Sequence, residues 1–308
     1  MATAIILGDD GWLAPSRFRW AKALAWLVVL AVISIAAFNI SADATLRLIV
    51  MISGEPFVSR ASSPTSARLI AVTVGAAAML AAYALSVRYV ERRSVPELGL
   101  RRFAPELGIG LAIGALLIAA IVGLMWVTGS VTITTTPVTK IAESLKQSVQ
   151  SGVIEEVLIR LIIFRLLWRI AGVVPSLLLT ALLFGGLHLS NPDATVFAAL
   201  CLVAGEGIGA ALYMLTGRIW MSIGMHAGWN FAQGWIFGSA VSGLNDFAGG
   251  PLQTRPAEGV AAIFSGGGFG PESSMAALAV SLCASAALLG LAWKRGRFVA
   301  SDGARTAV

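Results

Sequence analysis

The residues best suited to chemistry in this chain occur in a strongly apolar stretch, GVIEEVLIRLIIFRLLW. Glu155 and Glu156 are adjacent, and Arg160 follows Glu156 by four positions. In an α-helix, residues four apart share one face, whereas neighbours point about 100° apart. The pattern therefore predicts an ion pair between Glu156 and Arg160. It also leaves a second carboxylate, Glu155, that points elsewhere and needs another partner, a proton or water.

The chain has only two histidines, and both lie in apolar segments. In LLFGGLHLSN, Phe184 and His188 are four residues apart, and in SIGMHAGWNF the same spacing separates His226 from Asn230. A lone histidine in an apolar helix is more often a core residue than a catalyst. Three helices that each carry polar groups at this spacing instead predict one shared polar cavity.

Such a cavity could hydrolyse an amide bond. A carboxylate and an imidazole can remove a proton from water, as general bases do. A second imidazole and a carboxamide can donate hydrogen bonds to an oxyanion. The sequence shows no Gly-x-Ser-x-Gly or His-Glu-x-x-His motif, and no Ser-His-Asp or Cys-His arrangement stands out.

Other interpretations of the same residues remain open. The two glutamates and Arg160 could form a purely structural ion-pair cluster, or the helix could begin near residue 156 and leave Glu155 at the membrane interface. Two histidines and a glutamate could also bind zinc. Asn230 is a poor zinc ligand and Arg160 would repel a cation, so we expect no metal and no cofactor.

The elements that must position these groups are membrane helices. Hydrophobic residues make up 57% of the 308 and charged residues 12%, whereas a soluble domain averages about 25% charged residues. We expect an all-α polytopic membrane protein. Cys201 and Cys283 lie in apolar runs and are expected to be small buried hydrophobes. The apolar segments predict eight helices, at 22–40, 68–90, 106–127, 148–170, 174–190, 194–216, 218–238 and 274–293.

The basic residues predict the orientation. With a cytoplasmic N-terminus, fifteen of the 22 Lys and Arg residues flank the inside, six flank the outside and Arg160 lies within a helix. We therefore expect an integral, multi-pass protein of a bacterial-type plasma membrane with both termini cytoplasmic. Membrane orientation and contact with anionic lipid then explain the basic residues and the net charge of +6. No nucleic-acid partner is therefore expected.

The predicted organisation is a cytoplasmic segment at 1–21, a membrane domain at 22–293 and a cytoplasmic tail at 294–308. Ala42-Asp43-Ala44 resembles a signal-peptidase site, but the leader before the first apolar run is long and contains acids, which favours a retained helix. The Gly- and Pro-rich loop 239–273 is expected to be irregular, and the terminal SDGARTAV to be disordered.

Three stretches, EEVLIR (155–160), FGGLH (184–188) and HAGWN (226–230), occur in the order of the motifs of a known family. They resemble the CPBP intramembrane glutamic proteases, which include CAAX prenyl endopeptidases of the Rce1 type and many bacterial Abi proteins. TGRIW and PELGLRR also resemble family features, and the resemblance covers roughly 95–238. It implies a metal-free endopeptidase, with a motif core inside the membrane domain, that cuts a membrane protein or peptide in CAAX-type or other membrane-associated protein processing.

The resemblance also implies a role for each motif residue. Glu155 would be the general base, and His188 would help to hold and activate the water. His226 and Asn230 would stabilise the oxyanion of the tetrahedral intermediate.

The remaining motif residues would support these four. Glu156 and Arg160 would orient the site, and Phe184 would wall the cavity. Glu206, in VAGEGIGAAL, lies in mid-helix outside the motifs. It could pair with a neighbouring polar group, tune the proton balance of the site or contact substrate, and we favour the pairing.

A non-enzymatic function is the alternative. Buried Glu, His and Arg side chains also serve proton relays, so the chain could be a proton-coupled transporter, or an immunity or scaffold factor that binds a peptide partner. Transporters often contain repeats with matched broken helices, and no such pair is evident in this sequence.

Overall fold

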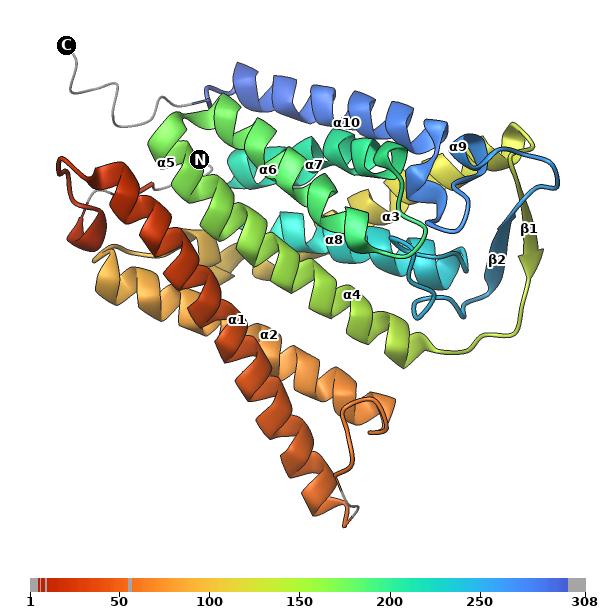
Figure 1. Cartoon of the computed structure of the whole chain (residues 1–308), viewed down its shortest axis with the longest axis horizontal. Coiled ribbons are helices and arrows are strands. Elements are labelled where there is room, and N and C mark those ends of the chain that lie inside the picture. The colour runs from red at the N-terminus through yellow and green to blue at the C-terminus, as the bar shows by residue number, and fades with distance from the viewer. Residues whose placement is uncertain (1–4, 6, 9, 55–56, 299–308) are drawn as a thin grey trace.

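The computed structural model describes residues 5, 7, 8, 10–54 and 57–298. Helices dominate it, with one two-stranded sheet (Figure 1). The α-helices and strands are α1 (Arg19–Ile52), α2 (Thr65–Val90), α3 (Phe103–Val127), α4 (Ile141–Glu156), α5 (Arg165–Ala171), α6 (Val173–Leu187), α7 (Val196–Thr216), α8 (Trp220–Phe231), α9 (Ala262–Ser265), α10 (Met275–Lys294), β1 (Val131–Thr135) and β2 (Leu252–Pro256). Two π-helical segments, η4 (Val157–Phe164) and η6 (Ala232–Ile236), continue α4 and α8, and the short 3₁₀ turns are η1 (Gly11–Leu13), η2 (Pro96–Leu98), η3 (Leu100–Arg102), η5 (His188–Ser190) and η7 (Pro271–Ser273).

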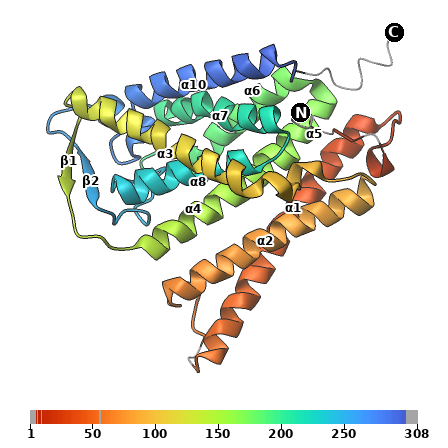
Figure 2. The same ribbon diagram turned by 180° about the vertical axis from the view of Figure 1, so that it is seen from behind.

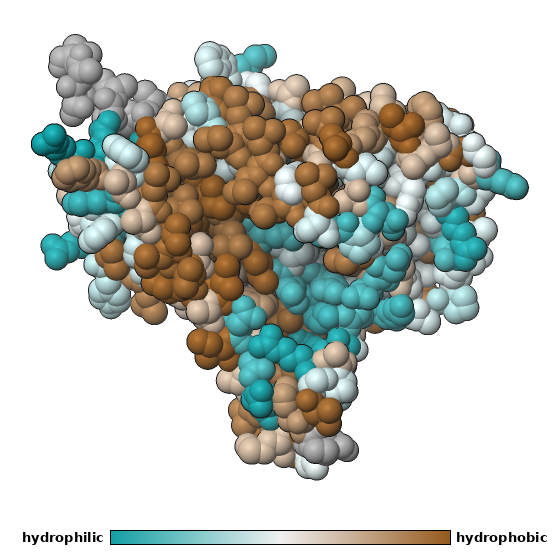
Figure 3. Space-filling view, viewed as in Figure 1, coloured by the Kyte–Doolittle hydropathy of each residue, from teal (hydrophilic) through white to brown (hydrophobic). Residues whose placement is uncertain are grey.

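This architecture confirms an all-α polytopic membrane protein. A helix lies at each of the eight predicted segments. Within the described residues, six helices are long and apolar enough to cross a membrane: α1, α2, α3, α6, α7 and α10. The continuous helix α4–η4–α5 carries many polar residues and α8 has only 12 residues, so the full count of eight crossings stays a prediction. Apolar surface covers much of the bundle between its more hydrophilic ends (Figure 3).

Several details differ from the sequence-based expectations. Helix α1 continues beyond residue 40 to Ile52, because the added residues include neither Gly nor Pro and an Asp43–Arg47 ion pair (2.6 Å) spans one turn. Cys283 is exposed on α10, not buried as Cys201 is. The terminal SDGARTAV lies outside the described residues.

The loop 239–273 is more regular than expected. It contains α9 and β2, and β2 pairs antiparallel with β1 from Val131↔Pro256 to Thr135↔Leu252. The β-branched run VTITT favours a strand, but its partner lies far along the chain. We call the end of the bundle that carries this sheet the sheet end. The opposite end, where α1 begins and α10 ends, is the terminus end (Figure 1).

Helix α8 lies against α3 (Figure 2), and small residues allow this close contact. Both helices carry Gly-x-x-x-Gly, ending at Gly114 in α3 and at Gly228 in α8. A Cβ atom at Gly114 would collide with the carbonyl oxygen of Met225, and one at Gly228 with that of Leu111. Such small residues let two membrane helices approach closely. His226 lies between the α8 glycines, so this contact sets its position.

A buried ion network closes the terminus end. Glu91, directly after α2, accepts hydrogen bonds from Arg165 (2.6 Å), Arg93 (2.8 Å) and the Trp26 indole (2.8 Å). Arg93 also pairs with Glu97 at 2.6 Å. Burial raises the pKa of Glu91, but the charges and hydrogen bonds of its partners outweigh this and lower the pKa to about 2, from an ordinary 4.5.

We predict that Gly114→Ala destabilises the protein by about 1–3 kcal/mol, because the added methyl group overpacks the α3–α8 contact. Gly123, on the same helix, has no atom within 4 Å of a Cβ built on it, so Gly123→Ala is the matched control and should be neutral. Thermal unfolding of the purified proteins in detergent measures both. Equal unfolding midpoints for the two variants would contradict the close packing.

Glu91→Gln should cost about 3–5 kcal/mol near pH 7, because it leaves buried guanidinium groups without their anion. A carboxyl whose pKa is lower in the folded state stabilises the fold fully above its unfolded value of 4.5. That stabilisation is lost as the pH falls toward 2, so the wild type and the variant should converge in acid. Thermal unfolding from pH 7 to pH 3 tests this, with the exposed Glu258→Gln as the control. A difference that is independent of pH would contradict it.

Candidate active site

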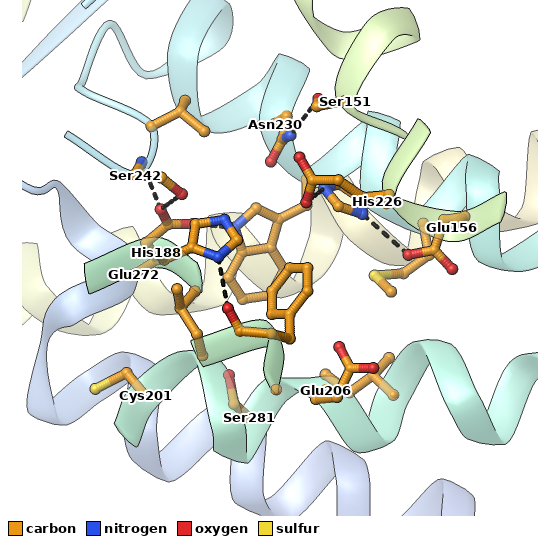
Figure 4. Close-up of a pocket in the computed structure, with 18 of the residues that line it drawn as sticks. Ser151, Glu156, His188, Cys201, Glu206, His226, Asn230, Ser242, Glu272 and Ser281 are labelled. Atoms are coloured by element: carbon orange, nitrogen blue, oxygen red, sulfur yellow. Dashed lines mark hydrogen bonds and ion pairs between the residues drawn. The ribbon is translucent and has the colours of Figure 1, made fainter. Parts of the chain in front are cut away.

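A cavity lies among α4, α6, α7, α8 and the sheet-end loops, and Figure 4 shows it with the chain in front cut away. All eight predicted site residues line it, which places the three motifs and Glu206 around one space. These residues are Glu155, Glu156, Arg160, Phe184, His188, Glu206, His226 and Asn230.

Glu156 is the hub of the site and is completely buried. One carboxylate oxygen accepts from Nδ1 of His226 at 3.0 Å. The other meets the Ser222 hydroxyl and lies 3.1 Å from Nε of Arg160. The predicted Glu156–Arg160 pair is therefore present. With three partners on its two oxygens, Glu156 is suited to hold other groups in place and has little capacity left to act on water.

Arg160 is shared by two carboxylates. Its Nη1 lies 2.8 Å from Glu206 of α7, in addition to the contact with Glu156. Only 2% of the Arg160 surface is exposed. The guanidinium passes so close to α7 that a Cβ atom at Gly209 would overlap it. Glu206 therefore pairs with a neighbouring polar group, which is the interpretation favoured from the sequence.

Glu155 is placed differently from its neighbour. Its side chain is 30% exposed, and its Oε2 lies 3.6 Å from Nε2 of His226, which is beyond hydrogen-bonding distance. Within the described chain that oxygen has no hydrogen-bond partner. Because α4 begins at Ile141, Glu155 lies inside the helix and not at its interfacial start. Of the two adjacent carboxylates, Glu156 is thus fixed and Glu155 is free toward the cavity.

His188 presents one ring nitrogen to the cavity. Its Nδ1 lies 2.8 Å from the carbonyl oxygen of Phe184, which can only accept, so Nδ1 carries a proton. In the neutral ring, Nε2 then has a free lone pair. The Phe184 ring packs on His188 (4.6 Å between centroids) and meets His226 edge-on (6.2 Å). Glu155 and His188 line the same cavity, and no direct contact between them is seen among the described residues.

Asn230 is fixed by a serine that the sequence analysis missed. Its amide nitrogen donates to Oγ of Ser151 at 2.8 Å, and the Ser151 hydroxyl donates to the carbonyl oxygen of Gln147 at 2.9 Å. Ser222 was missed as well. Each serine precedes a motif residue by four positions: Ser151 precedes Glu155, and Ser222 precedes His226. This one-turn spacing is a signal that could have identified both.

Glu272 was also missed, and no sequence pattern marks it. It is 4% exposed and lines the cavity from the turn before α10. One oxygen accepts from the backbone N–H (2.6 Å) and hydroxyl (2.7 Å) of Ser242, and the other from the Trp229 indole (3.1 Å). Figure 4 shows Glu272 beside Ser242 and His188. Glu272 therefore ties the sheet-end loop to α8 over the cavity.

These groups define a class of protein: a membrane-embedded helical bundle with carboxylates, imidazoles and an amide around one cavity, the set expected for amide hydrolysis. Among the described residues, no group of three His, Cys, Asp or Glu side chains is placed to hold a metal ion.

Comparison with known families agrees with this class. Residues 137–232 match the family described as "Type II CAAX prenyl endopeptidase Rce1-like", so this part of the chain is similar to Rce1-like proteases. The match includes all three motifs, while the upstream PELGLRR lies outside it. Searches of curated proteins and of solved structures found no match.

We predict that Gly209→Ala displaces the Arg160 guanidinium and lowers proteolytic activity at least tenfold, since Arg160 positions Glu156. Gly108→Ala is the matched control, because a Cβ atom there meets nothing within 4 Å. The measurement is the set of protein termini generated in membranes by each variant, with thermal unfolding to confirm folding. Full activity in folded Gly209→Ala protein would show that the position of Arg160 does not matter.

Proposed function

We propose that this chain is a glutamic intramembrane endopeptidase in which Glu155 activates water. The proposal rests on one observation: the two adjacent carboxylates differ in burial and in their partners. Glu156 is buried and occupied by Arg160, Ser222 and His226. Glu155 faces the same cavity, and one of its oxygens has no hydrogen-bond partner among the described residues.

In the proposed reaction, a water molecule lies between Glu155 and the free Nε2 of His188. Glu155 takes a proton from this water as the oxygen attacks the scissile carbonyl carbon. The carbonyl π electrons move to oxygen and form an oxyanion. When the C–N bond breaks, the proton held by Glu155 goes to the leaving amine, which completes hydrolysis and restores the carboxylate.

The oxyanion is stabilised from α8. Asn230 donates one amide proton to Ser151 and has a second available. His226 keeps Nδ1–H on Glu156, so Nε2 can donate when the ring is protonated. Both residues are held by the α3–α8 glycine contact, and donors fixed in advance stabilise developing charge better than mobile ones.

The substrate class is a peptide bond in a membrane-associated protein or peptide. The matched family is described by its action on CAAX prenyl proteins, and processing of that type or of other membrane proteins is the general role we propose for this chain.

The test compares the termini of membrane proteins in cells that express the wild type, Glu155→Gln or Glu258→Gln. Loss of a general base costs about 10²–10⁴-fold, so Glu155→Gln should remove the termini that the wild type creates. Glu258→Gln should leave them unchanged.

Two outcomes would contradict the proposal. Persistence of the same termini with folded Glu155→Gln protein would exclude Glu155 as the base. If the wild type creates no termini and the purified protein cleaves none of the membrane proteins offered to it, the non-enzymatic alternative, a transporter or peptide-binding factor, would be favoured.

A further inference from the structure

Six glutamates are buried in the part of the chain that the structure describes, and five of them pair with an arginine. The five pairs are Glu91–Arg165 (2.6 Å), Glu97–Arg93 (2.6 Å), Glu156–Arg160 (3.1 Å), Glu206–Arg160 (2.8 Å) and Glu106–Arg218. The sixth is Glu272, which is 4% exposed and forms no ion pair with any described Lys or Arg. A buried charge without a partner of opposite sign is costly, so Glu272 differs from the other five in a way that local packing does not explain.

The contacts of Glu272 suit an ionised carboxylate. The Trp229 indole N–H and the Ser242 backbone N–H can only donate, and they reach different carboxylate oxygens, at 3.1 Å and 2.6 Å. The Ser242 hydroxyl is a third donor, at 2.7 Å. A carboxylate accepts about four hydrogen bonds on its two oxygens, so one position remains open on the oxygen that faces Trp229. All three donors are neutral, and the negative charge stays uncompensated.

Glu272 lies at the same cavity as the proposed catalytic groups. It lines this cavity together with Glu155 and His188, and Figure 4 shows it with Ser242 and His188. Its partner Trp229 also lines the cavity and directly precedes Asn230 on α8. Because the face of an indole ring attracts cations, Trp229 and the carboxylate of Glu272 both favour a positively charged group at this place.

The protein itself supplies no such group. Among the described residues that line the cavity, Arg160 is the one Lys or Arg. Its guanidinium is already shared by Glu156 and Glu206. Opposite charges attract strongly where water is largely excluded, so a cation that enters the cavity has Glu272 as a carboxylate without a competing arginine.

We propose that Glu272 is a specificity-determining residue that binds a Lys or Arg side chain of the substrate close to the scissile bond. This inference rests on the proposed endopeptidase function. The ammonium or guanidinium group donates to the open acceptor position of Glu272 and provides the positive charge that the other five buried glutamates obtain from within the chain. The substrate class is then a membrane-associated protein or peptide with a basic residue beside the bond that is cut.

The cleavage sites test this assignment. The termini that depend on Glu155 are mapped in cells that express the wild type, Glu272→Gln or the exposed Glu258→Gln. Lys and Arg should be enriched in the residues that flank the cleaved bonds of the wild type and of Glu258→Gln, and Glu272→Gln should lose this enrichment. Wild-type sites without such enrichment would overturn the inference and leave the endopeptidase function intact. A complete absence of Glu155-dependent termini would instead contradict the endopeptidase function, and with it the specificity.

A pair of peptides separates recognition of charge from a structural role of Glu272. Both span a mapped cleavage site, and they carry either Lys or norleucine, an apolar residue of similar length, at the basic position. The wild type should cleave the Lys peptide with a kcat/KM about 10–100-fold higher, as expected for a hydrogen bond to a charged group. Glu272→Gln should cleave the two peptides equally well, whereas Ser242→Ala, which keeps the carboxylate, should retain the preference. An equal loss for both peptides in Glu272→Gln, or loss of the preference in Ser242→Ala, would show that Glu272 only holds the loop, and the proposal would fail.

Discussion

The site depends on one buried guanidinium, Arg160, held between Glu156 and Glu206. Ion pairs far from water are stable only when every partner is present and well placed, because a buried charge left alone is costly. Arg160 therefore fixes Glu156, and Glu156 in turn fixes the His226 ring through Nδ1. These contacts occupy both carboxylate oxygens of Glu156, whereas Glu155 faces the cavity.

Other contacts in the bundle hold these residues in position. The α3–α8 glycine contact sets the position of His226, and Gly209 gives Arg160 the room it needs against α7. At the other end of the α4–η4–α5 helix, Arg165 joins the network around Glu91. The helix that carries the carboxylates is thus anchored by buried charge at two levels, which restricts its rotation within the bundle. At the sheet end, the loops beside the cavity are joined by hydrogen bonds from Asn191 to Ser242 and from Ser242 to Glu272.

Local spacing explains what could be predicted from the sequence. The Glu156–Arg160 pair follows from a four-residue separation on one helix, and the shared cavity from polar groups repeated at that separation. The contact of Glu206 with Arg160 depends on which two helices are neighbours, which no local pattern encodes. Glu272 lies in an irregular turn, and β1 finds its partner more than a hundred residues away, so both depend on tertiary structure alone.

The most direct test of the account is a single-turnover cleavage in H₂¹⁸O, using a substrate identified from the Glu155-dependent termini. Mass spectrometry then locates the label in the new carboxyl group and in the peptide that contains Glu155. If Glu155 acts only on water, one ¹⁸O atom enters the product and none enters Glu155. Incorporation of ¹⁸O into the Glu155 carboxylate would show that it attacks the substrate directly, which would contradict the account.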